Sequence, residues 1–411
     1  MRSHSTQLMT HRIKHLLVAA AALGCAHAVA AERNPALDLL VKKGLITAEE
    51  RAQALEQSAM AKMAAGPRDI PWYEKMSIDG YTQVRNTEAM SDDAGLTGAL
   101  PADRSVDPNQ NLVIRRGRFK ISGDFGRVFL YTQFDLAASV DSGSRGNLGM
   151  QTRDIYADIA LDEAKEHRIR VGVSKVPYGW VNLQSSQNRL QMERPEALNS
   201  AVEGERDQGL YYMYANTEDR ALFKSLVKDG FKGSGDYGVF TAGVYSGAGL
   251  NRADNNGGVH SVVRFSKPWV SASGQMYEAG IGAYAGRFKV TTSELSTGAN
   301  NAPTMSDTDK NEGFIDRRAV ATFIMYPQPW GIEAEWTTGQ GPQLNHERNA
   351  ITTQSLQGGY IMVNYRHKYG EQSEFLPFVR WNYFDGARKF ANNAPKLCVN
   401  EIDVGFEWQW R

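Results

Sequence analysis

The chain has 411 residues, and its 46 Lys and Arg are balanced by 46 Asp and Glu, so the formal net charge is zero. A mean hydropathy of −0.45, with no run of about 18–20 apolar residues, excludes a membrane protein built from helices. The aromatic content (16 Phe, 17 Tyr and 8 Trp) argues against disorder. The balanced charge provides no surplus of basic residues for binding nucleic acid, and two cysteines are too few for a disulfide-rich scaffold.

The first 31 residues are typical of a secretory signal peptide. Arg12 and Lys14 precede the short apolar run 16–23, and small residues follow at 28–31. Two alternatives stay open: a buried amphipathic helix, or a lipoprotein signal in which Cys25 becomes the lipidated first residue. Cleavage would remove three basic residues and no acidic one, which leaves a mature chain of net charge −3.

Residues 32–75 read as a short helical segment on the periplasmic side. Residues 35–43 place apolar side chains on one face and end at Gly44, which suits a helix C-terminus. Thr47 and Glu50 have the spacing of a capping box, so a second helix is predicted to follow. A pair of helices this small has no stable core of its own, which favours an arm, a plug or an oligomerisation segment.

Residues 76–411 alternate between apolar and polar with period two, and this pattern predicts an all-β fold. Segments of about ten residues, separated by turn residues and rich in aromatic side chains at their ends, match the strands of a transmembrane antiparallel β-barrel. Fourteen such segments are evident, and two more are conceivable at 220–232 and 286–293, so we predict sixteen strands. The alternative is a large soluble β protein exported to the periplasm. The segments are near 76–85, 112–122, 127–139, 152–161, 167–176, 206–215, 236–246, 259–267, 274–286, 313–326, 330–338, 357–367, 375–385 and 399–411.

Odd and even positions of a strand face opposite sides of the sheet, and this alternation places several basic side chains on the inner face of the barrel. Arg116, Arg118 and Lys120 share one face of their strand with Ile114, and Arg168 and Arg170 share one face of another. A Lys or Arg facing lipid near the middle of the bilayer costs roughly 2–4 kcal/mol, so these charges are expected to face the lumen. They are candidates for a ladder that binds anions, because Arg pairs with oxyanions through two parallel hydrogen bonds. Acidic residues share the inner face, so an ordinary solvated wall is an equal alternative.

The stretch 176–206 is the longest in the first half of the chain without alternation. It carries Arg189, Arg194 and Arg206 together with Glu193 and Glu205. Long loops without regular structure are usually functional, and in a wide barrel such a loop can fold inward and set the narrowest point. The alternative is an external loop with ordinary solvated charges.

Four stretches of the chain resemble the phosphate-selective porin O and P family. They are RRGRFKISGDFG (115–126), RDIYADI (153–159), RVGVSKVPYGWVNLQSSQNRLQMERPEALN (170–199) and GERDQGLYY (204–212). The resemblance covers about residues 76–411. It implies a homotrimer of sixteen-stranded channels in the bacterial outer membrane, a third external loop that enters the pore, and conduction of small anions such as phosphate. By motif, Arg116, Arg118 and Lys120 would form the family's basic strand, and Arg189, Arg194 and Arg206 would belong to the loop.

The function expected is therefore passive diffusion of small hydrophilic solutes, with outer-membrane lipid and lipopolysaccharide around the barrel. Two alternatives remain: a general or cation-tolerant porin without phosphate selectivity, and a structural or adhesive barrel with a blocked lumen. An enzyme is not expected, since no histidine stands in a nucleophile motif. No Cys/His cluster has the spacing of a metal site, and no cofactor is implied.

Overall fold

The structure is a computed structural model. The chain divides into two compact units, with the boundary after Pro71. The predicted signal peptide lies outside the residues that the structure describes. These described residues are 35–64, 70–88, 112–137, 149–254, 257–294, 302–369 and 373–410.

The first unit contains two helices, α2 (Pro35–Lys42) and α3 (Ala48–Ala64). Gly44 adopts φ +68° and donates its backbone N–H to Val41 O at 2.9 Å, which ends α2. The capping box is formed in both directions: Glu50 N donates to Thr47 Oγ1 at 3.1 Å, and Thr47 N donates to Glu50 Oε2 at 2.7 Å. No helix in the described part of the chain is both long and apolar enough to cross a membrane.

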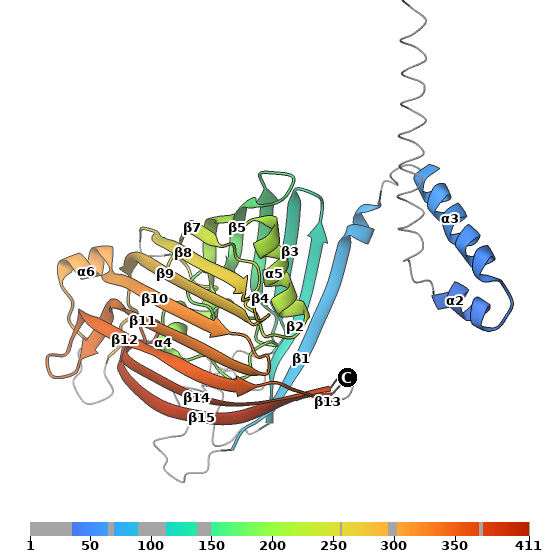
Figure 1. Cartoon of the computed structure of the whole chain (residues 1–411). Helices are drawn as coiled ribbons and strands as arrows, with labels where there is room; N and C mark the ends of the chain where they lie inside the picture. The colour runs from blue at the N-terminus through green and yellow to red at the C-terminus, as the bar shows by residue number, and fades with distance from the viewer. Residues whose placement is uncertain are drawn as a thin grey trace, which may run out of the picture. The chain divides into compact units, whose positions relative to one another are not determined.

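The second unit is one antiparallel sheet of fifteen strands, preceded by the 3-10 turn η1 (Trp72–Lys75). Each long strand pairs with its neighbours in sequence, so the sheet is an up-and-down meander that curves around an interior (Figure 1). The strands are β1 (Met76–Asn86), β2 (Leu112–Asp124), β3 (Val128–Asp135), β4 (Gln151–Ala160), β5 (His167–Lys175), β6 (Arg206–Tyr214), β7 (Phe240–Tyr245), β8 (His260–Val270), β9 (Met276–Phe288), β10 (Phe314–Met325), β11 (Trp330–Asn345), β12 (Ala350–Tyr365), β13 (His367–Tyr369), β14 (Ser373–Ala387) and β15 (Lys396–Gln409).

The fourteen predicted segments are confirmed as strands, and the additional strand is β13, a three-residue piece paired with β14. The two further strands considered are absent from the described sheet. Residues 217–228 form helix α5 (Thr217–Lys228), and β9 ends at Phe288. The sheet has the antiparallel meander expected of a porin, with fifteen strands among the described residues where sixteen were predicted. No pairing between β1 and β15 closes it into a barrel within that part of the chain.

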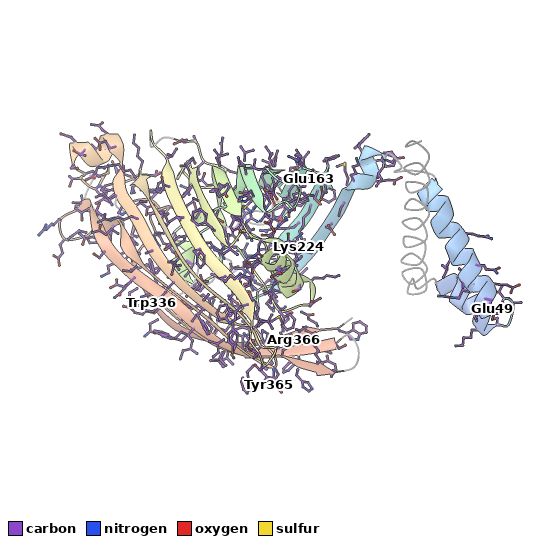
Figure 2. The ribbon with its side chains drawn as sticks, turned by 45° about the horizontal axis from the view of Figure 1, so that its top comes forward. Glu49, Glu163, Lys224, Trp336, Tyr365 and Arg366 are labelled. Carbon is purple, nitrogen blue, oxygen red and sulfur yellow. The ribbon has the colours of Figure 1, made fainter. Side chains whose placement is uncertain are left out.

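The two faces of the sheet follow the alternation of the sequence. On the outer face of β15, Ile402, Val404 and Phe406 are at least 65% exposed. Trp336 on β11 also lies on this outer face (Figure 2), while its neighbour Glu335 is buried on the inner one. An apolar outside with a polar inside is the arrangement of a barrel that is surrounded by lipid.

One predicted side-chain direction on β2 is wrong. We expected Ile114 to share the inner face with Arg116, but it is 46% exposed on the outer side. The register between β1 and β2 shifts between Gln83 and Val84, so that Arg115 is an extra, bulged residue. A bulge reverses the alternation beyond it, and the reversal turns Ile114 outward while leaving Arg116 and Arg118 inside.

Two segments that connect strands fold into the interior from opposite ends. The first is the connection 176–205 between β5 and β6, which contains α4 (Glu196–Asn199) and η3 (Glu203–Glu205). The second is the connection 215–239 between β6 and β7, which contains α5. Figure 1 shows α4 and α5 enclosed by the curved sheet. Trp180 of the first segment and Leu226 of the second belong to one apolar cluster inside the molecule.

Candidate functional site

The connection 176–205, called the inner loop below, is fixed to the far wall of the sheet by two carboxylates. Glu335 on β11 accepts the backbone N–H of Trp180 at 2.6 Å and that of Val181 at 2.7 Å. The Trp180 indole donates to Glu278 Oε2 on β9 at 3.1 Å. These contacts span about 100 to 155 residues of sequence, so the inner loop crosses the lumen.

Arginines on the opposite strands hold the end of the inner loop. Arg318 on β10 donates to the carbonyl of Ala197 at 3.1 Å, and to the hydroxyl and carbonyl of Ser200 at 2.9 and 3.1 Å. Arg388, which precedes β15, pairs with Glu196 at 2.9 Å. The helix α4 is thereby clamped against the wall, and the prediction that the loop folds inward is confirmed in its geometry.

A cluster of arginines surrounds Glu193 where the inner loop meets β1 and β2. Glu193 Oε1 lies 3.0 Å from Arg85, 2.9 Å from Arg115 and 3.6 Å from Arg116. Burial alone would raise the pKa of Glu193, but these positive charges outweigh it and hold that pKa well below its usual range. One carboxylate is therefore shared among several guanidinium groups. We call this group, with Arg189 and Arg194, the arginine cluster.

Arg189 is the arginine of this cluster whose guanidinium has the fewest hydrogen-bond acceptors in the described structure. Its side chain is only 5% exposed, and no described residue accepts a hydrogen bond from its Nε or Nη1. Burial lowers the pKa of Arg189 to about 10, so the group is still charged at neutral pH. A buried guanidinium with free donors is unfavourable unless a ligand or water satisfies it.

The other two arginines of the inner loop region have carboxylate partners. Arg194 pairs with Glu205 and donates to Asn199 Oδ1 at 3.0 Å. Burial holds the pKa of Arg194 well below its usual range. Arg206 at the start of β6 donates to Asp154 at 2.9 Å and to Glu205 at 3.0 Å.

The basic residues predicted on strands all lie on the inner side, but most are paired. Arg118 contacts Asp135 at 3.0 Å, and Arg168 contacts Asp236 at 2.7 Å. Arg170 forms a two-bond contact with Asp158 at 2.7 and 2.8 Å. The exception is Lys120, which has no carboxylate within salt-bridge distance in the described structure.

The structure separates the predicted residues into two groups. Arg116, Arg189 and Arg194 gather around Glu193, whereas Arg118, Lys120, Arg170 and Arg206 line a cavity deeper in the molecule. Arg168 lies apart from both, at the end of β5 where its carboxylate partner is in the connection that carries α5. The binding roles assigned to all of these residues stay predictions.

Sequence reasoning did not single out several basic residues of the interior, among them Arg85, Lys175 and Arg115. Arg85 is 2% exposed and Lys175 is 8% exposed, and both lie at strand ends. Parity along 76–85 would have found Arg85, but along 167–176 it places Lys175 on the face of the exposed Val171, so Lys175 had no such signal. Arg115 could not have been found in this way, because the bulge that turns it inward has no signal in the local alternation.

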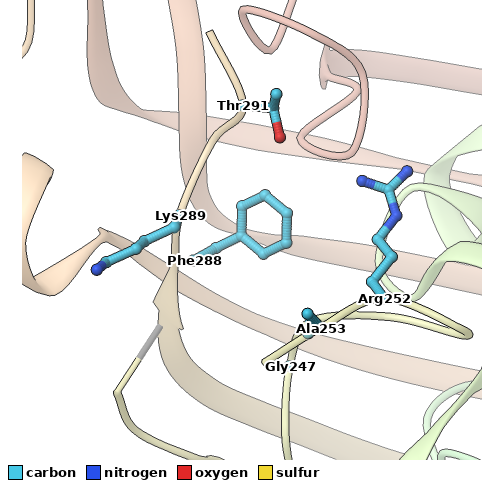
Figure 3. Close-up of a pocket in the computed structure, with 7 residues that line it drawn as sticks. Gly247, Arg252, Ala253, Phe288, Lys289 and Thr291 are labelled. Carbon is cyan, nitrogen blue, oxygen red and sulfur yellow. The ribbon is translucent and has the colours of Figure 1, made fainter. Parts of the chain in front are cut away.

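A second basic cavity, of about 270 Å³, lies at the end of the sheet where the long connections are. Figure 3 shows Arg252, Phe288, Lys289 and Thr291 around it. Arg252 pairs with Glu203 of the inner loop at 2.7 Å. Short turns such as 125–127 and 271–275 lie at the opposite end of the strands. Outer-membrane barrels have their long loops outside and their short turns in the periplasm, so this cavity belongs to the outer mouth.

Comparison with known proteins agrees with this architecture. The profile of the family described as phosphate-selective porin O and P matches residues 88–411. The chain belongs to that family. It is an outer-membrane porin channel. No functionally curated sequence matches the porin significantly.

Solved structures share its fold at very low identity. OmpT of Vibrio cholerae is 9% identical, with a TM-score of 0.42 over 84% of this chain and 85% of that one. OmpF of Salmonella typhi in complex with daunomycin is 9% identical, with a TM-score of 0.44 over 82% and 86%. An anion-selective porin from Comamonas acidovorans is 10% identical, with a TM-score of 0.34 over 80% and 98%. These values describe likeness of fold alone.

Proposed function

We propose that this porin conducts small anions, phosphate among them, and that the arginine cluster beside the inner loop sets its preference. The observation that carries the proposal is Arg189, a buried guanidinium whose Nε and Nη1 have no acceptor in the described structure. A small oxyanion in the pore would satisfy these donors. A cation would meet uncompensated positive charge.

The local charge count supports an anion preference even though the mature chain is predicted to be net acidic. The cluster contains five guanidinium groups, from Arg85, Arg115, Arg116, Arg189 and Arg194, against the carboxylates of Glu193 and Glu205. Surface acids far from the pore are screened over a Debye length of about 8 Å, so they matter less than charges at the constriction. For this reason the local charges support a cation-tolerant porin less well than an anion-selective one.

Arginine suits this task because its planar fork binds oxyanions through parallel hydrogen bonds. Ion pairs between arginines and aspartates elsewhere in the interior also affect how strongly an anion is held. Arg118, Arg170 and Arg206 are held by Asp135, Asp158 and Asp154, which lowers the positive charge they present to a passing anion. Conduction needs sites that attract an anion without trapping it.

The mouth cavity provides the first step of the path. Arg252 and Lys289 would draw anions toward the entrance, and the inner loop would then pass them to the arginine cluster. Basic side chains along a channel with low-dielectric walls raise the local concentration of anions.

We infer in addition that three copies of the chain assemble into a homotrimer surrounded by outer-membrane lipid and lipopolysaccharide. The apolar outer face of the sheet supports contact with lipid, and family membership supports the trimer. The mass of the detergent-solubilised complex tests this assembly, and a monomer in mild detergent would contradict it.

Ion selectivity is the decisive measurement. In a planar bilayer with a KCl gradient, the reversal potential is expected to indicate anion selectivity, and Arg189→Gln is expected to lower the anion-to-cation permeability ratio several-fold. Arg127→Gln is the matched control, because Arg127 lies in an exposed turn outside the lumen. Cation selectivity of the wild type, or an unchanged ratio in Arg189→Gln, would overturn the proposal. Absence of conductance steps would favour the structural barrel with a blocked lumen.

A further inference from the structure

Deeper than the arginine cluster, the interior contains a polar cavity of about 210 Å³. Its walls come from the inner faces of β2 to β6, from the inner loop, and from the connection that carries α5. The residues used below are Lys120, Gln133, Tyr156, Arg170, Lys175 and Ser234.

The connection 215–239 forms part of the wall of this cavity, through Val227, Ser234 and Tyr237. Gln184 of the inner loop donates to the carbonyl of Lys232 at 2.6 Å, so the two inward segments meet inside the lumen. On the other side, Arg220 and Arg168 both contact Asp236, at 2.9 and 2.7 Å. Elements that enter from both ends of the sheet therefore form part of the wall of this cavity.

The cavity carries a surplus of positive charge. Arg170 is compensated by Asp158, as described above. Lys120 and Lys175, however, have no carboxylate within salt-bridge distance among the residues described. Lys175 donates instead to the backbone carbonyls of Leu183 and Gln184, at 2.8 and 2.9 Å. Lys120 thus brings a positive charge to the cavity wall without a fixed counter-ion, whereas the amino group of Lys175 is held by the inner loop.

Neutral hydrogen-bond donors in the same cavity are also unsatisfied. Gln133 is 4% exposed, and its Nε2 has no acceptor in the described structure, although its Oε1 accepts from Tyr131 at 3.1 Å. Ser234 is 6% exposed, and its hydroxyl has no partner there either. Buried polar groups are normally paired. These donors therefore indicate a ligand that carries both a charged group and neutral hydrogen-bond acceptors.

The ring faces of the tyrosines that line the cavity are occupied by neighbouring side chains. Tyr131 and Tyr156 stack on one another with centroids 5.2 Å apart, and the guanidinium of Arg170 lies 4.0 Å from the centroid of Tyr156. The faces of this row are covered by their neighbours. A ligand that binds by stacking an apolar ring is thereby disfavoured, and one that is polar on all sides is favoured.

The size of the cavity exceeds what inorganic phosphate requires. At about 30 Å³ for each water molecule, 210 Å³ corresponds to roughly seven waters. A phosphate ion fills a fraction of this space and leaves Gln133 and Ser234 unsatisfied. A phosphate carried on a short polyol would reach both groups.

We propose that this cavity is a selectivity site for phosphate monoesters of small polyols. Lys120 attracts the phosphate group, and Gln133 and Ser234 donate hydrogen bonds to polyol hydroxyls. The inference rests on the proposed anion channel and adds a substrate class to it.

The test is a titration of channel block in a planar bilayer, with glycerol 3-phosphate, inorganic phosphate and glycerol as probes. For the wild type, the half-blocking concentration of glycerol 3-phosphate is expected to be roughly five- to tenfold lower than that of phosphate, the effect of one to two net hydrogen bonds. Glycerol alone is expected not to block. The variant pair Gln133→Ala with Ser234→Ala should raise the value for glycerol 3-phosphate to that for phosphate, and should leave the value for phosphate unchanged.

The matched controls are Gln208→Ala and Ser261→Ala, which remove the same groups from exposed positions on β6 and β8. Equal block by the two anions in the wild type would overturn the inference, and this comparison depends on no variant. An advantage for glycerol 3-phosphate that persists in the double variant would overturn the assigned residues. A channel that is anion-selective without preferring the monoester refutes this inference alone, whereas a channel without anion selectivity refutes the proposed function as well.

Discussion

The carboxylate of Glu335 accepts the backbone N–H of Trp180 at 2.6 Å, across 155 positions of sequence. This contact makes an acidic wall residue the anchor of the inner loop. Glu335 is 2% exposed, so it is not a solvated charge of the lumen. The position of the loop in the pore depends on this side chain.

We predict that Glu335→Gln loosens the inner loop. A carboxamide oxygen can replace only part of the contact with the two amides, which removes about 1–3 kcal/mol of local stability. Single-channel recordings should show increased current noise and brief changes of conductance level. The matched control is Glu333→Gln on the same face of β11, because Glu333 contacts Tyr360 of the wall and not the loop. Equal noise in both variants would contradict the anchoring role.

Arg318 is predicted to hold the other end of the inner loop. Arg318→Met removes three hydrogen bonds from a charged donor to Ala197 and Ser200, each worth about 1.5–3 kcal/mol. The loop should then become cleavable by protease in the folded protein. Arg317→Met is the control, since Arg317 lies on the opposite face of β10. Resistance to protease in Arg318→Met would count against the clamp.

The arginine cluster should resist acid. The pKa of Glu193 is lower in the folded protein than in the unfolded chain, so its stabilising contribution is complete above about pH 4.3 and is lost only as the pH falls through the lowered value. Anion selectivity should therefore be the same at pH 7 and pH 4. Glu193→Gln at pH 7 should raise the anion-to-cation permeability ratio. A rise in wild-type anion selectivity near pH 4.5, like that expected for Glu193→Gln, would show that Glu193 titrates normally.

The outer face of the sheet should not tolerate charge. Ile281 is 65% exposed near the middle of β9, so Ile281→Lys should cost roughly 2–4 kcal/mol when this face meets lipid. Urea unfolding in lipid vesicles measures the difference. Ile281→Phe is the apolar control and should change stability little. Equal stabilities of the Lys and Phe variants would place this face in water.

The helical segment is predicted to be dispensable for conduction. Deletion of residues 35–71 removes the first compact unit and none of the strands. Conductance and ion selectivity of the remaining chain should be unchanged. Altered selectivity after the deletion would assign the helices a role in the pore.

Local patterns predicted some features of the interior well. The position of Arg118 inside and Leu130 outside follows from alternation, because a strand sends successive side chains to opposite faces. The helix α5 was missed, although Asn216 caps it by accepting from Asp219 N at 2.8 Å. A capping residue followed by Leu222, Phe223 and Leu226 at helical spacing is a signal that could have identified it.

Other features had no local signal at all. The bulge that turns Arg115 inward arises from the pairing of β2 with β1, and the partner of Arg168 lies 68 positions away at Asp236. Whether Arg170 is free for an anion or neutralised by Asp158 depends on strand register, which alternation within one strand cannot specify.

The sequence by itself determined the class of the protein, because period-two alternation over ten residues is a local property of each strand, and the resemblance added the family. The tertiary structure decided what the interior does. It brought Glu193 among the arginines, left Nε and Nη1 of Arg189 without an acceptor among the described residues, and formed a cavity lined by two segments that enter from opposite ends. These outcomes are nonlocal, since the electrostatic environment of a charge depends on which distant strands and loops pack against it.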